Sequence, residues 1–401
     1  MATATATIQG HCDEKFSQVK DLLQRYVDSG DEVGASIAVN VDGKDVVDIW
    51  GGYADQDRTR PWEKDTITNV FSTTKTVVAL AILLLVDRGV LSVTDKVCKY
   101  WPEFAANGKQ DIEIRHVLSH TAGLPGFDTP LTVQDVCDAP RMAALLAAQA
   151  PWWEPGTASG YHSFTQGFLL GEIVRRATGT PLKQFIAEEI AAPLEADFQL
   201  GCREHDEPRV SDVIPPPARV ALPPTSAESP PSIGMRVMAN PPMKAAFANS
   251  AAWRRAEVGA GNGHSNARGV ARILSVLSRN GRVGHDAAAR SESESVDRTF
   301  ISPETVALIF QEQYKGLDHV IDSGGKPLRW GIGFGLTGPD TWIDYLPEGR
   351  VCTWGGYGGS MVVVDLDRKV TIAYVMNRME EVGLGSRKAR EYFAAVYAAL
   401  G

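Results

Sequence analysis

Apolar residues recur with helical periodicity at both ends of the chain. Between Asp13 and Ser29 they return every three or four residues, and Gly30 follows, which predicts an amphipathic helix with a glycine stop. Residues 386–400 predict a second terminal helix. Residues 77–86 are apolar at every position, so a buried helix is expected from residue 74 to about residue 88.

Strand-like runs gather at the same two ends. Residues 35–41 and 44–50 flank Asp42-Gly43, a strong signal for a β-hairpin. Further strands are predicted at residues 330–336, 350–354, 361–365 and 370–375. The middle of the chain is mostly helical in pattern. We therefore expect an α/β (α+β) fold, in which one antiparallel sheet is built from both termini, flanked by terminal helices, and carries an inserted, mostly helical lobe.

The same pattern divides the chain into two expected domains. Residues 1–90 and 320–401 would form the sheet domain, and residues 91–319 the inserted, mainly helical domain. Within the insert, residues 208–242 contain ten prolines. Because proline lacks the backbone N–H and restricts φ, this segment is expected to avoid regular helix and central strand. It would wrap over the surface as an extended segment or, alternatively, form a mobile lid over a site.

Composition and charge exclude several classes of protein. The 401 residues are 44% hydrophobic and 22% charged, an ordinary globular balance. With 40 Lys and Arg against 49 Asp and Glu, the net charge is −9, so no nucleic-acid partner is expected. The ten-residue apolar run is half a membrane span, so no membrane association is expected. The N-terminal residues show no secretory signal and the five cysteines form no CxxC pair, which favours a cytoplasmic protein.

Several familiar catalytic and ligand-binding motifs are missing from the sequence. It contains no G-x-S-x-G, no H-E-x-x-H and no GxxxxGK[ST]. His116 and His120 are four residues apart and could share a helix face, but no third ligand is evident. Local hydrogen bonding around the following turn is the expected role of this pair, and neither a metal nor an organic cofactor is expected.

The candidate catalytic residues in the sequence are a serine and a lysine three residues apart. This S-x-x-K spacing occurs three times, at Ser17, Ser72 and Ser323, so the spacing alone says little. Ser72 stands out because it falls at the start of the apolar helix, where free backbone N–H groups favour a developing oxyanion. Lys75 abuts the apolar run, and partial desolvation favours its neutral, proton-accepting form. The alternative is a serine N-cap with a snorkelling lysine.

Five segments in chain order resemble the serine β-lactamase and penicillin-binding-protein-like superfamily, in its class C and family VIII carboxylesterase branch. They are Phe71-Ser-Thr-Thr-Lys75, Ile114-Arg-His-Val-Leu-Ser-His-Thr-Ala-Gly-Leu124, Gly160-Tyr-His-Ser163, Asn262-Gly-His-Ser-Asn-Ala-Arg268 and Trp354-Gly-Gly356. The matches extend over roughly residues 30–380. Polyketide side-chain acyltransferases are related to this branch, so the resemblance implies acyl chemistry on a serine.

The resemblance implies a role for each matching residue. Ser72 would be the acyl-accepting nucleophile, with Lys75 and Tyr161 as its general-base pair. The backbone N–H groups of Ser72 and Tyr357 would form the oxyanion hole. For the tryptophan of the last segment, packing against the sheet is the alternative role. The residues expected to contact the substrate are Trp354, Gly355, Gly356 and Ser163.

Two departures from the superfamily pattern indicate the kind of substrate. Trp354 stands where β-lactam-binding relatives carry a lysine that attracts the substrate carboxylate, and an indole offers no point charge. Ser163 replaces the amide of the Y-x-N motif. Both changes favour a neutral, more apolar substrate, in a pocket lined by residues 125–160 and parts of 208–260. The sequence therefore predicts a serine hydrolase that cleaves small-molecule carboxylic esters through an acyl-Ser72 intermediate.

Three other activities stay open at this stage. An acyltransferase would pass the acyl group of an ester or thioester to an alcohol through the same intermediate. An amide or β-lactam hydrolase would need stronger protonation of the leaving group. A catalytically idle scaffold would keep the fold, but Ser72, Lys75 and Tyr161 are all retained.

Overall fold

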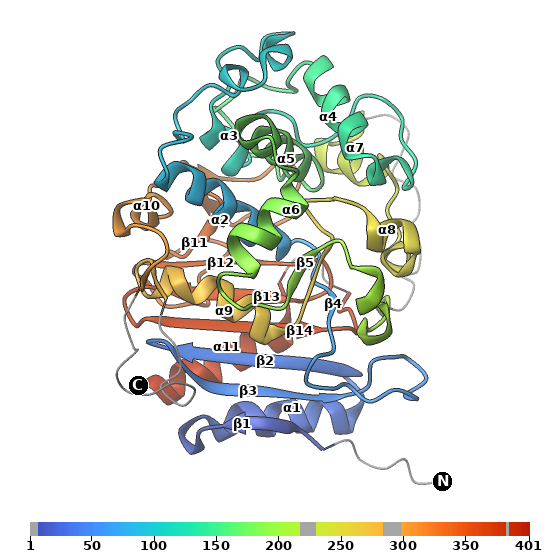
Figure 1. Ribbon diagram of the computed structural model, residues 1–401, viewed down its shortest axis with the longest axis vertical. Coiled ribbons are helices and arrows are strands. Elements are labelled where there is room, and N and C mark those ends of the chain that lie inside the picture. The colour runs from blue at the N-terminus through green and yellow to red at the C-terminus, as the bar shows by residue number, and fades with distance from the viewer. Residues whose placement is uncertain (1–6, 217–229, 284–297, 382–384) are drawn as a thin grey trace.

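A nine-stranded antiparallel sheet is the main feature of the computed structural model, which describes residues 7–216, 230–283, 298–381 and 385–401 (Figure 1). In spatial order the strands are β1 (Gln9–Cys12), β3 (Lys44–Gly52), β2 (Gly34–Val41), β14 (Val370–Met376), β13 (Met361–Asp365), β12 (Val351–Gly355), β11 (Gly335–Leu336), β10 (Leu328–Trp330) and β9 (Tyr314–Gly316). β2 pairs with β14, with Ile37 opposite Tyr374. The two ends of the chain thus form one continuous sheet, and the predicted fold class is confirmed.

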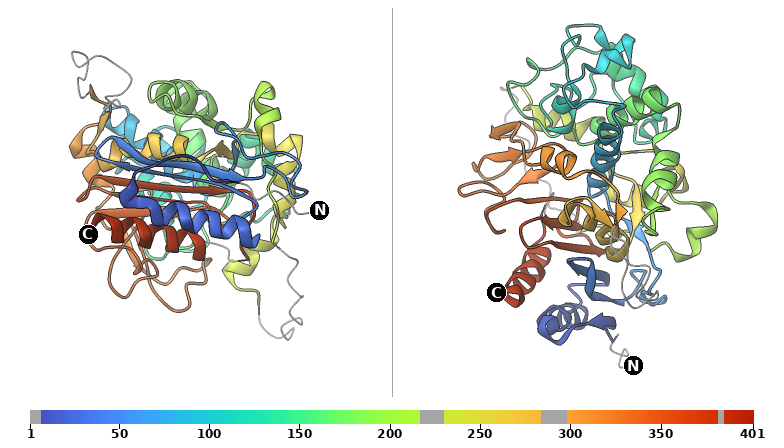
Figure 2. Two further views of the ribbon diagram at one scale, coloured as in Figure 1. Left: turned by 90° about the horizontal axis from the view of Figure 1, so that it is seen from below. Right: turned by 60° about the vertical axis from the view of Figure 1, so that its left-hand side comes forward.

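Helices cover both faces of this sheet. α1 (Ser17–Ser29) and α11 (Arg387–Leu400) lie side by side on one face (Figure 2). α9 (Ala267–Ser278) packs on the opposite face against β2, β13 and β14. The remaining α-helices are α2 (Thr74–Asp87), α3 (Ile114–Leu118), α4 (Ala139–Ala148), α5 (Thr165–Thr178), α6 (Leu182–Ile186), α7 (Ile233–Ala239), α8 (Ala251–Arg255) and α10 (Pro303–Leu308). Most of these belong to the lobe above the sheet in Figure 1.

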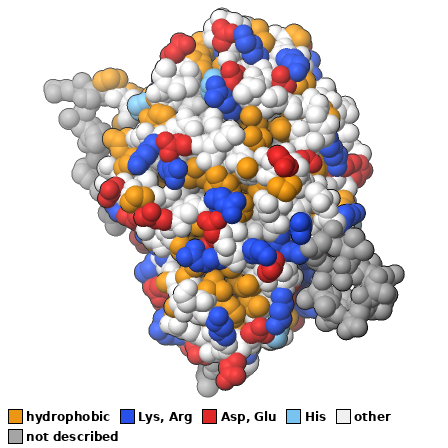
Figure 3. Space-filling model, turned by 90° about the vertical axis from the view of Figure 1, so that its left-hand side faces the viewer, with side chains coloured by type: hydrophobic (Ala, Val, Ile, Leu, Met, Phe, Trp, Pro, Cys, Tyr) orange, Lys and Arg blue, Asp and Glu red, His pale blue; other side chains and the backbone are white. Residues whose placement is uncertain are grey.

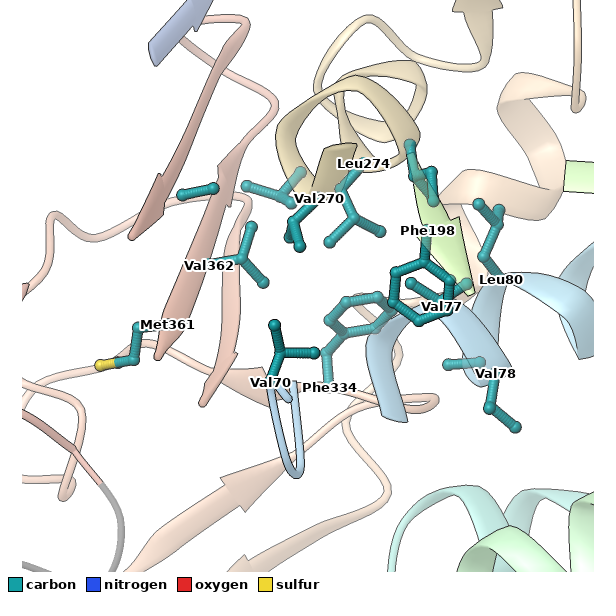
Figure 4. Packing of buried hydrophobic residues seen from close by; sticks show 14 of the residues in the cluster. Val70, Val77, Val78, Leu80, Phe198, Val270, Leu274, Phe334, Met361 and Val362 are labelled. Atoms are coloured by element: carbon teal, nitrogen blue, oxygen red, sulfur yellow. The ribbon is translucent and has the colours of Figure 1, made fainter. Parts of the chain in front are cut away.

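The core that supports the site lies between α9, α2 and the sheet. Val270 and Leu274 of α9 approach Val77 of α2 and Val362 of β13 (Figure 4). Every side chain from residue 77 to residue 85 is 2% exposed or less, which confirms the predicted buried helix. An α-helix that is apolar all round needs such burial on every side. Within the described residues, we find no helix with the length and apolarity to cross a membrane.

Two predicted elements differ from the structure. The single strand expected at residues 330–336 is a hairpin of β10 and β11, because Gly331 N–H donates to the Phe334 carbonyl and Gly333 takes a φ of 80°. Within the proline-rich segment, the prediction of no regular helix is wrong for α7. The stretch from residue 232 to residue 240 contains no proline, and the Ser232 side chain caps α7 by accepting the Met235 N–H. Residues 217–229 of that segment lie outside the described residues.

The expected division into a sheet domain and an inserted lobe stays a prediction. Two elements from within residues 91–319 nevertheless contact the sheet directly, since β9 is its edge strand and α9 covers one of its faces. A second, three-stranded sheet that the sequence did not reveal joins β4 (Thr68–Asn69), β6 (Gly263–Ser265) and β5 (Phe198–Leu200). Its first strand, β4, directly precedes the S-x-x-K segment in the chain.

Candidate active site

Ser72 sits in a sharp turn between the small sheet and α2. The residue before it, Phe71, has a φ of +44°, a conformation that bulky side chains rarely adopt. Phe71 forms a bridge with Asn262, and Val70 N–H donates to the Gly263 carbonyl over 2.9 Å. Such backbone geometry persists only where the surroundings hold it. The Asn262 segment thus supports the turn that presents Ser72, at the N-terminal end of α2.

Lys75 lies one helical turn further on, and its amine has three partners. Nζ is 3.2 Å from Ser72 Oγ, 2.7 Å from the Ser163 carbonyl and 2.9 Å from the Ala260 carbonyl. A carbonyl can only accept hydrogen bonds, and a neutral amine has two N–H groups and one lone pair. When the two N–H groups of the neutral amine donate to the two carbonyls, the lone pair points toward the Ser72 hydroxyl and can accept its proton. Burial lowers the pKa of Lys75 well below its usual 10.5, which favours that neutral form.

Tyr161 approaches the same place from the segment before α5. Its hydroxyl accepts a hydrogen bond from Trp354 Nε1 over 3.1 Å, and Lys75 Nζ is 4.8 Å from the centre of its ring. Burial raises the pKa of Tyr161 well above 10, and hydrogen bonds with Ser72 and Trp354 act in the opposite direction. A phenol in this state keeps its proton at neutral pH. It is therefore suited to pass a proton on once the neighbouring lysine has accepted one.

An aromatic cluster surrounds the Tyr161 ring. The His120 ring is 4.7 Å from Tyr161 and 4.5 Å from Trp330, and the Trp330 and Trp354 rings are 4.6 Å apart. Burial, followed by the nearby His162 and Lys75, holds the pKa of His120 well below 6.5, so this histidine is neutral. Its Nδ1 accepts the backbone N–H of His162 over 3.1 Å. Sequence reasoning expected only local hydrogen bonding here and missed the contact with Tyr161.

The two amides expected to form an oxyanion hole are both available. In the part of the chain that the structure describes, neither Ser72 N–H nor Tyr357 N–H donates to a protein acceptor. Ser360 links their two segments, since its Oγ donates to the Val70 carbonyl over 2.8 Å and lies 3.0 Å from Thr73 Oγ1. A donor left free and held in place suits a negative charge that develops on a bound carbonyl.

β12 brings the Trp354-Gly-Gly356 segment to this point. β11 pairs only with Cys352 and Thr353, so Trp354 and Gly355 extend beyond it while still pairing with β13. A Cβ on Gly356 would stand 2.3 Å from the Val70 carbonyl, so glycine permits the close approach of the two segments.

The structure places the remaining predicted residues around this centre. The backbone carbonyl of Ser163 accepts a hydrogen bond from Lys75. This contact does not involve the Ser163 side chain, which replaces the asparagine of the Y-x-N motif. The histidine pair shows no metal arrangement: among the described residues, no group of three or more His, Cys, Asp or Glu could hold an ion. His116 instead accepts the Glu113 N–H and caps α3.

On the face in Figure 3, acidic and basic side chains are interspersed among apolar ones.

Comparison with known proteins identifies the family of this chain. The sequence model of a family described as Beta-lactamase matches residues 19–397. The chain belongs to the Beta-lactamase family. A curated relative, the esterase/beta-lactamase LipL of Mycobacterium tuberculosis, is 37% identical over 281 residues, which are 68% of this chain and 65% of LipL. The match thus spans just under two thirds of that relative's length.

Solved structures resemble the chain over nearly its whole length. A family VIII carboxylesterase is 34% identical, with a TM-score of 0.85 over 98% of this chain and 99% of that chain. A penicillin-binding protein homologue from Caulobacter crescentus gives the same values. EstA from Arthrobacter nitroguajacolicus is 28% identical, with a TM-score of 0.82. The resemblance inferred from the five sequence segments is confirmed, and with it the β-lactamase-type fold of this family member.

Proposed function

We propose that this protein is a serine hydrolase that cleaves carboxylic esters through an acyl-Ser72 intermediate. The observation that carries the proposal is the environment of Lys75, whose amine contacts Ser72 Oγ while two backbone carbonyls occupy its other sides. A lysine that is buried and lacks an acidic partner acts as a base more readily than as a cation. Esterase names among the relatives, including EstB of Burkholderia gladioli at 31% identity over 47% of this chain, support ester substrates.

The acylation step follows from the positions of these groups. Ser72 Oγ attacks the ester carbonyl carbon while its proton passes to Lys75 Nζ. The carbonyl oxygen becomes an oxyanion and accepts hydrogen bonds from the N–H groups of Ser72 and Tyr357. As the C–O bond of the leaving group breaks, Tyr161 donates its hydroxyl proton to the departing alkoxide, which leaves as an alcohol. Lys75 then returns a proton to Tyr161, so the acyl-enzyme carries a neutral amine.

Deacylation uses the same groups in reverse. A water molecule attacks the acyl carbon and gives one proton to the base pair of Lys75 and Tyr161. The oxyanion hole again holds the negative charge. When the bond to Ser72 Oγ breaks, the pair returns the proton to that oxygen, and a carboxylic acid leaves. If an alcohol replaces water at this step, the product is a new ester, which is the acyltransferase alternative.

Neutral, apolar esters are the substrate class that the site favours. Trp354 stands where relatives that bind β-lactams carry a lysine. Its indole N–H already donates a hydrogen bond to Tyr161, so only the apolar ring is available to contact a substrate. Three large apolar side chains are exposed on two elements that contact each other, Met235 and Met238 on α7 and Leu317 in the loop before Asp318. α7 and this loop meet at Gly234, where an added Cβ atom would lie 3.2 Å from the Val320 carbonyl oxygen. We propose that these three side chains form an apolar rim of the site, which suits the hydrocarbon part of an ester.

The proposal is tested by intact-protein mass spectrometry after brief mixing with p-nitrophenyl butyrate. Wild type should gain one butyryl group or release p-nitrophenol rapidly, and Ser72→Ala should do neither. Ser17→Ala, which changes the serine of another S-x-x-K motif, is the matched control and should behave as wild type. Equal acylation or turnover by wild type and Ser72→Ala would refute the proposal. Ester formation on addition of alcohols would identify the acyltransferase alternative, and loss of a β-lactam's absorbance would identify β-lactam hydrolysis.

A further inference from the structure

Asp318 ties the Tyr161 segment to the loop that follows β9. Its Oδ1 accepts the backbone N–H of Tyr161, and also those of Val320 and Ile321, each over 2.9 Å. Its Oδ2 accepts the Ser159 hydroxyl over 2.6 Å. The carboxylate therefore has four donors, and one of them is the amide of Tyr161 itself. No motif of the sequence marks this aspartate.

Further contacts make the same junction rigid. Ser159 Oγ accepts the indole N–H of Trp330 over 2.8 Å, and the Ser159 carbonyl accepts the His319 N–H over 2.9 Å. Val320 and Ile321 pack against the cluster of Tyr161, Trp330 and Trp354. The carboxylate is thus connected to the aromatic cluster in two ways, through Ser159 and Trp330 and through the loop that packs against the cluster.

We propose that Asp318 is a positioning residue that holds the Tyr161 hydroxyl where it can protonate the leaving group. Asp318 acts through the backbone of Tyr161 and through the Ser159–Trp330 contact, and it does not touch the Ser72–Lys75 pair. The inference rests on the proposed ester hydrolysis at Ser72. A displacement of about 1 Å in a catalytic group is enough to reduce a rate about a hundredfold.

The proposal can be tested because the Ser72–Lys75 pair and Tyr161 act on different parts of the substrate. Attack by Ser72 depends on Lys75, whereas departure of a poor leaving group depends on the Tyr161 proton. A p-nitrophenolate leaves without being protonated, but an ethoxide does not. Loss of Asp318 should therefore slow the hydrolysis of ethyl butyrate much more than that of p-nitrophenyl butyrate. General destabilisation of the fold would reduce both rates equally.

The experiment compares kcat/KM, which reports the acylation step, on the two esters for wild type, Asp318→Ala, Asp318→Asn and Asp322→Ala. Asp322 is the matched control, an exposed aspartate of the same loop whose Oδ1 accepts the Gly324 N–H. For Asp318→Ala we expect about a tenfold to hundredfold loss with ethyl butyrate and less than about threefold with p-nitrophenyl butyrate. Asp318→Asn keeps an oxygen for the three amides and should recover most of the lost rate. Asp322→Ala should match wild type on both esters.

The possible results separate this inference from the proposed function. If wild type and Asp322→Ala hydrolyse both esters and Asp318→Ala shows an unchanged ratio of the two rates, the positioning role is wrong. If wild type hydrolyses neither ester, the proposed function fails and the inference falls with it. Should Asp318→Ala not fold, as judged by its thermal unfolding, Ser159→Ala replaces it. This variant leaves the aspartate in place and is expected to change the ratio several-fold, and an unchanged ratio there also overturns the proposal.

Discussion

The indole Nε1 of Trp354 donates a hydrogen bond to the hydroxyl oxygen of Tyr161 across 3.1 Å. Both side chains are buried, at 3% and 5% exposure, so water competes little for this contact. An indole stabilises a phenolate oxygen as it forms but adds no formal charge to the site. In the proposed mechanism the same side chain therefore supports proton transfer by Tyr161, and it does not supply a cation that would attract an anionic substrate.

Replacing this indole should weaken proton donation by Tyr161. In Trp354→Phe the ring volume is largely kept but the hydrogen bond is lost, and a hydrogen bond contributes about 0.5–1.5 kcal/mol. We expect a threefold to tenfold loss of kcat/KM on ethyl butyrate, roughly the equivalent of that energy, and little change on p-nitrophenyl butyrate. Trp342→Phe, an indole that packs against the same cluster, is the control. Equal losses on both esters in Trp354→Phe would contradict this role.

The pH dependence of activity should report the burial of Lys75. The neutral amine is the active form, and burial lowers the pKa of Lys75 well below 10.5. As pH rises, kcat/KM on p-nitrophenyl butyrate should therefore increase and reach its plateau well below pH 10.5. Lys75→Arg keeps the positive charge but cannot deprotonate, so we expect a loss of about 10²- to 10⁴-fold at every pH tested. Lys20→Arg, in another S-x-x-K motif, should leave the profile unchanged. Appreciable activity of Lys75→Arg would exclude the lysine as the base.

Gly356 should be needed for the position of the Tyr357 amide. In Gly356→Ala the new Cβ would lie 2.3 Å from the Val70 carbonyl and 2.5 Å from Ser360 Oγ, so β12 and the Ser72 turn must move apart. Loss of one oxyanion-hole donor costs about 10²- to 10³-fold in kcat, and a loss of that order is expected. Gly171→Ala is the control, because its Cβ would meet the Leu182 side chain at an ordinary 3.4 Å. A Gly356→Ala enzyme that folds and keeps wild-type kcat would show that Tyr357 N–H is not part of the hole.

The apolar rim of Met235, Met238 and Leu317 should determine how well longer acyl chains react. A buried methylene contributes about 0.8 kcal/mol. In the triple variant with serine at these positions, we expect kcat/KM for p-nitrophenyl octanoate to fall about tenfold relative to p-nitrophenyl acetate. Val90→Ser is the control, since Val90 is also an exposed large apolar residue but follows α2, near Gly89. If the ratio of the two esters is unchanged, the rim does not contact the acyl chain.

Local sequence patterns determined most of the elements that carry the site. Apolar periodicity with a glycine stop located α1, a continuous apolar run located α2, and Asp42-Gly43 located the β2–β3 hairpin, because these signals act between residues close in the chain. Ser72 and Lys75 could be recognised for the same reason, since one helical turn joins them. The hairpin of β10 and β11 was missed because the turn at Gly331 lies inside a continuous strand-like run.

Only the tertiary structure decided how these residues work together. The carbonyls that hold the Lys75 amine lie 88 and 185 residues further along the chain, and Asp318 lies 157 residues from Tyr161. A backbone carbonyl is present at every position, so nothing in the sequence marks the two that bind Lys75. The sequence thus determined which side chains were available for chemistry. The packing of distant segments decided the burial, the hydrogen bonds and therefore the proton that each side chain holds.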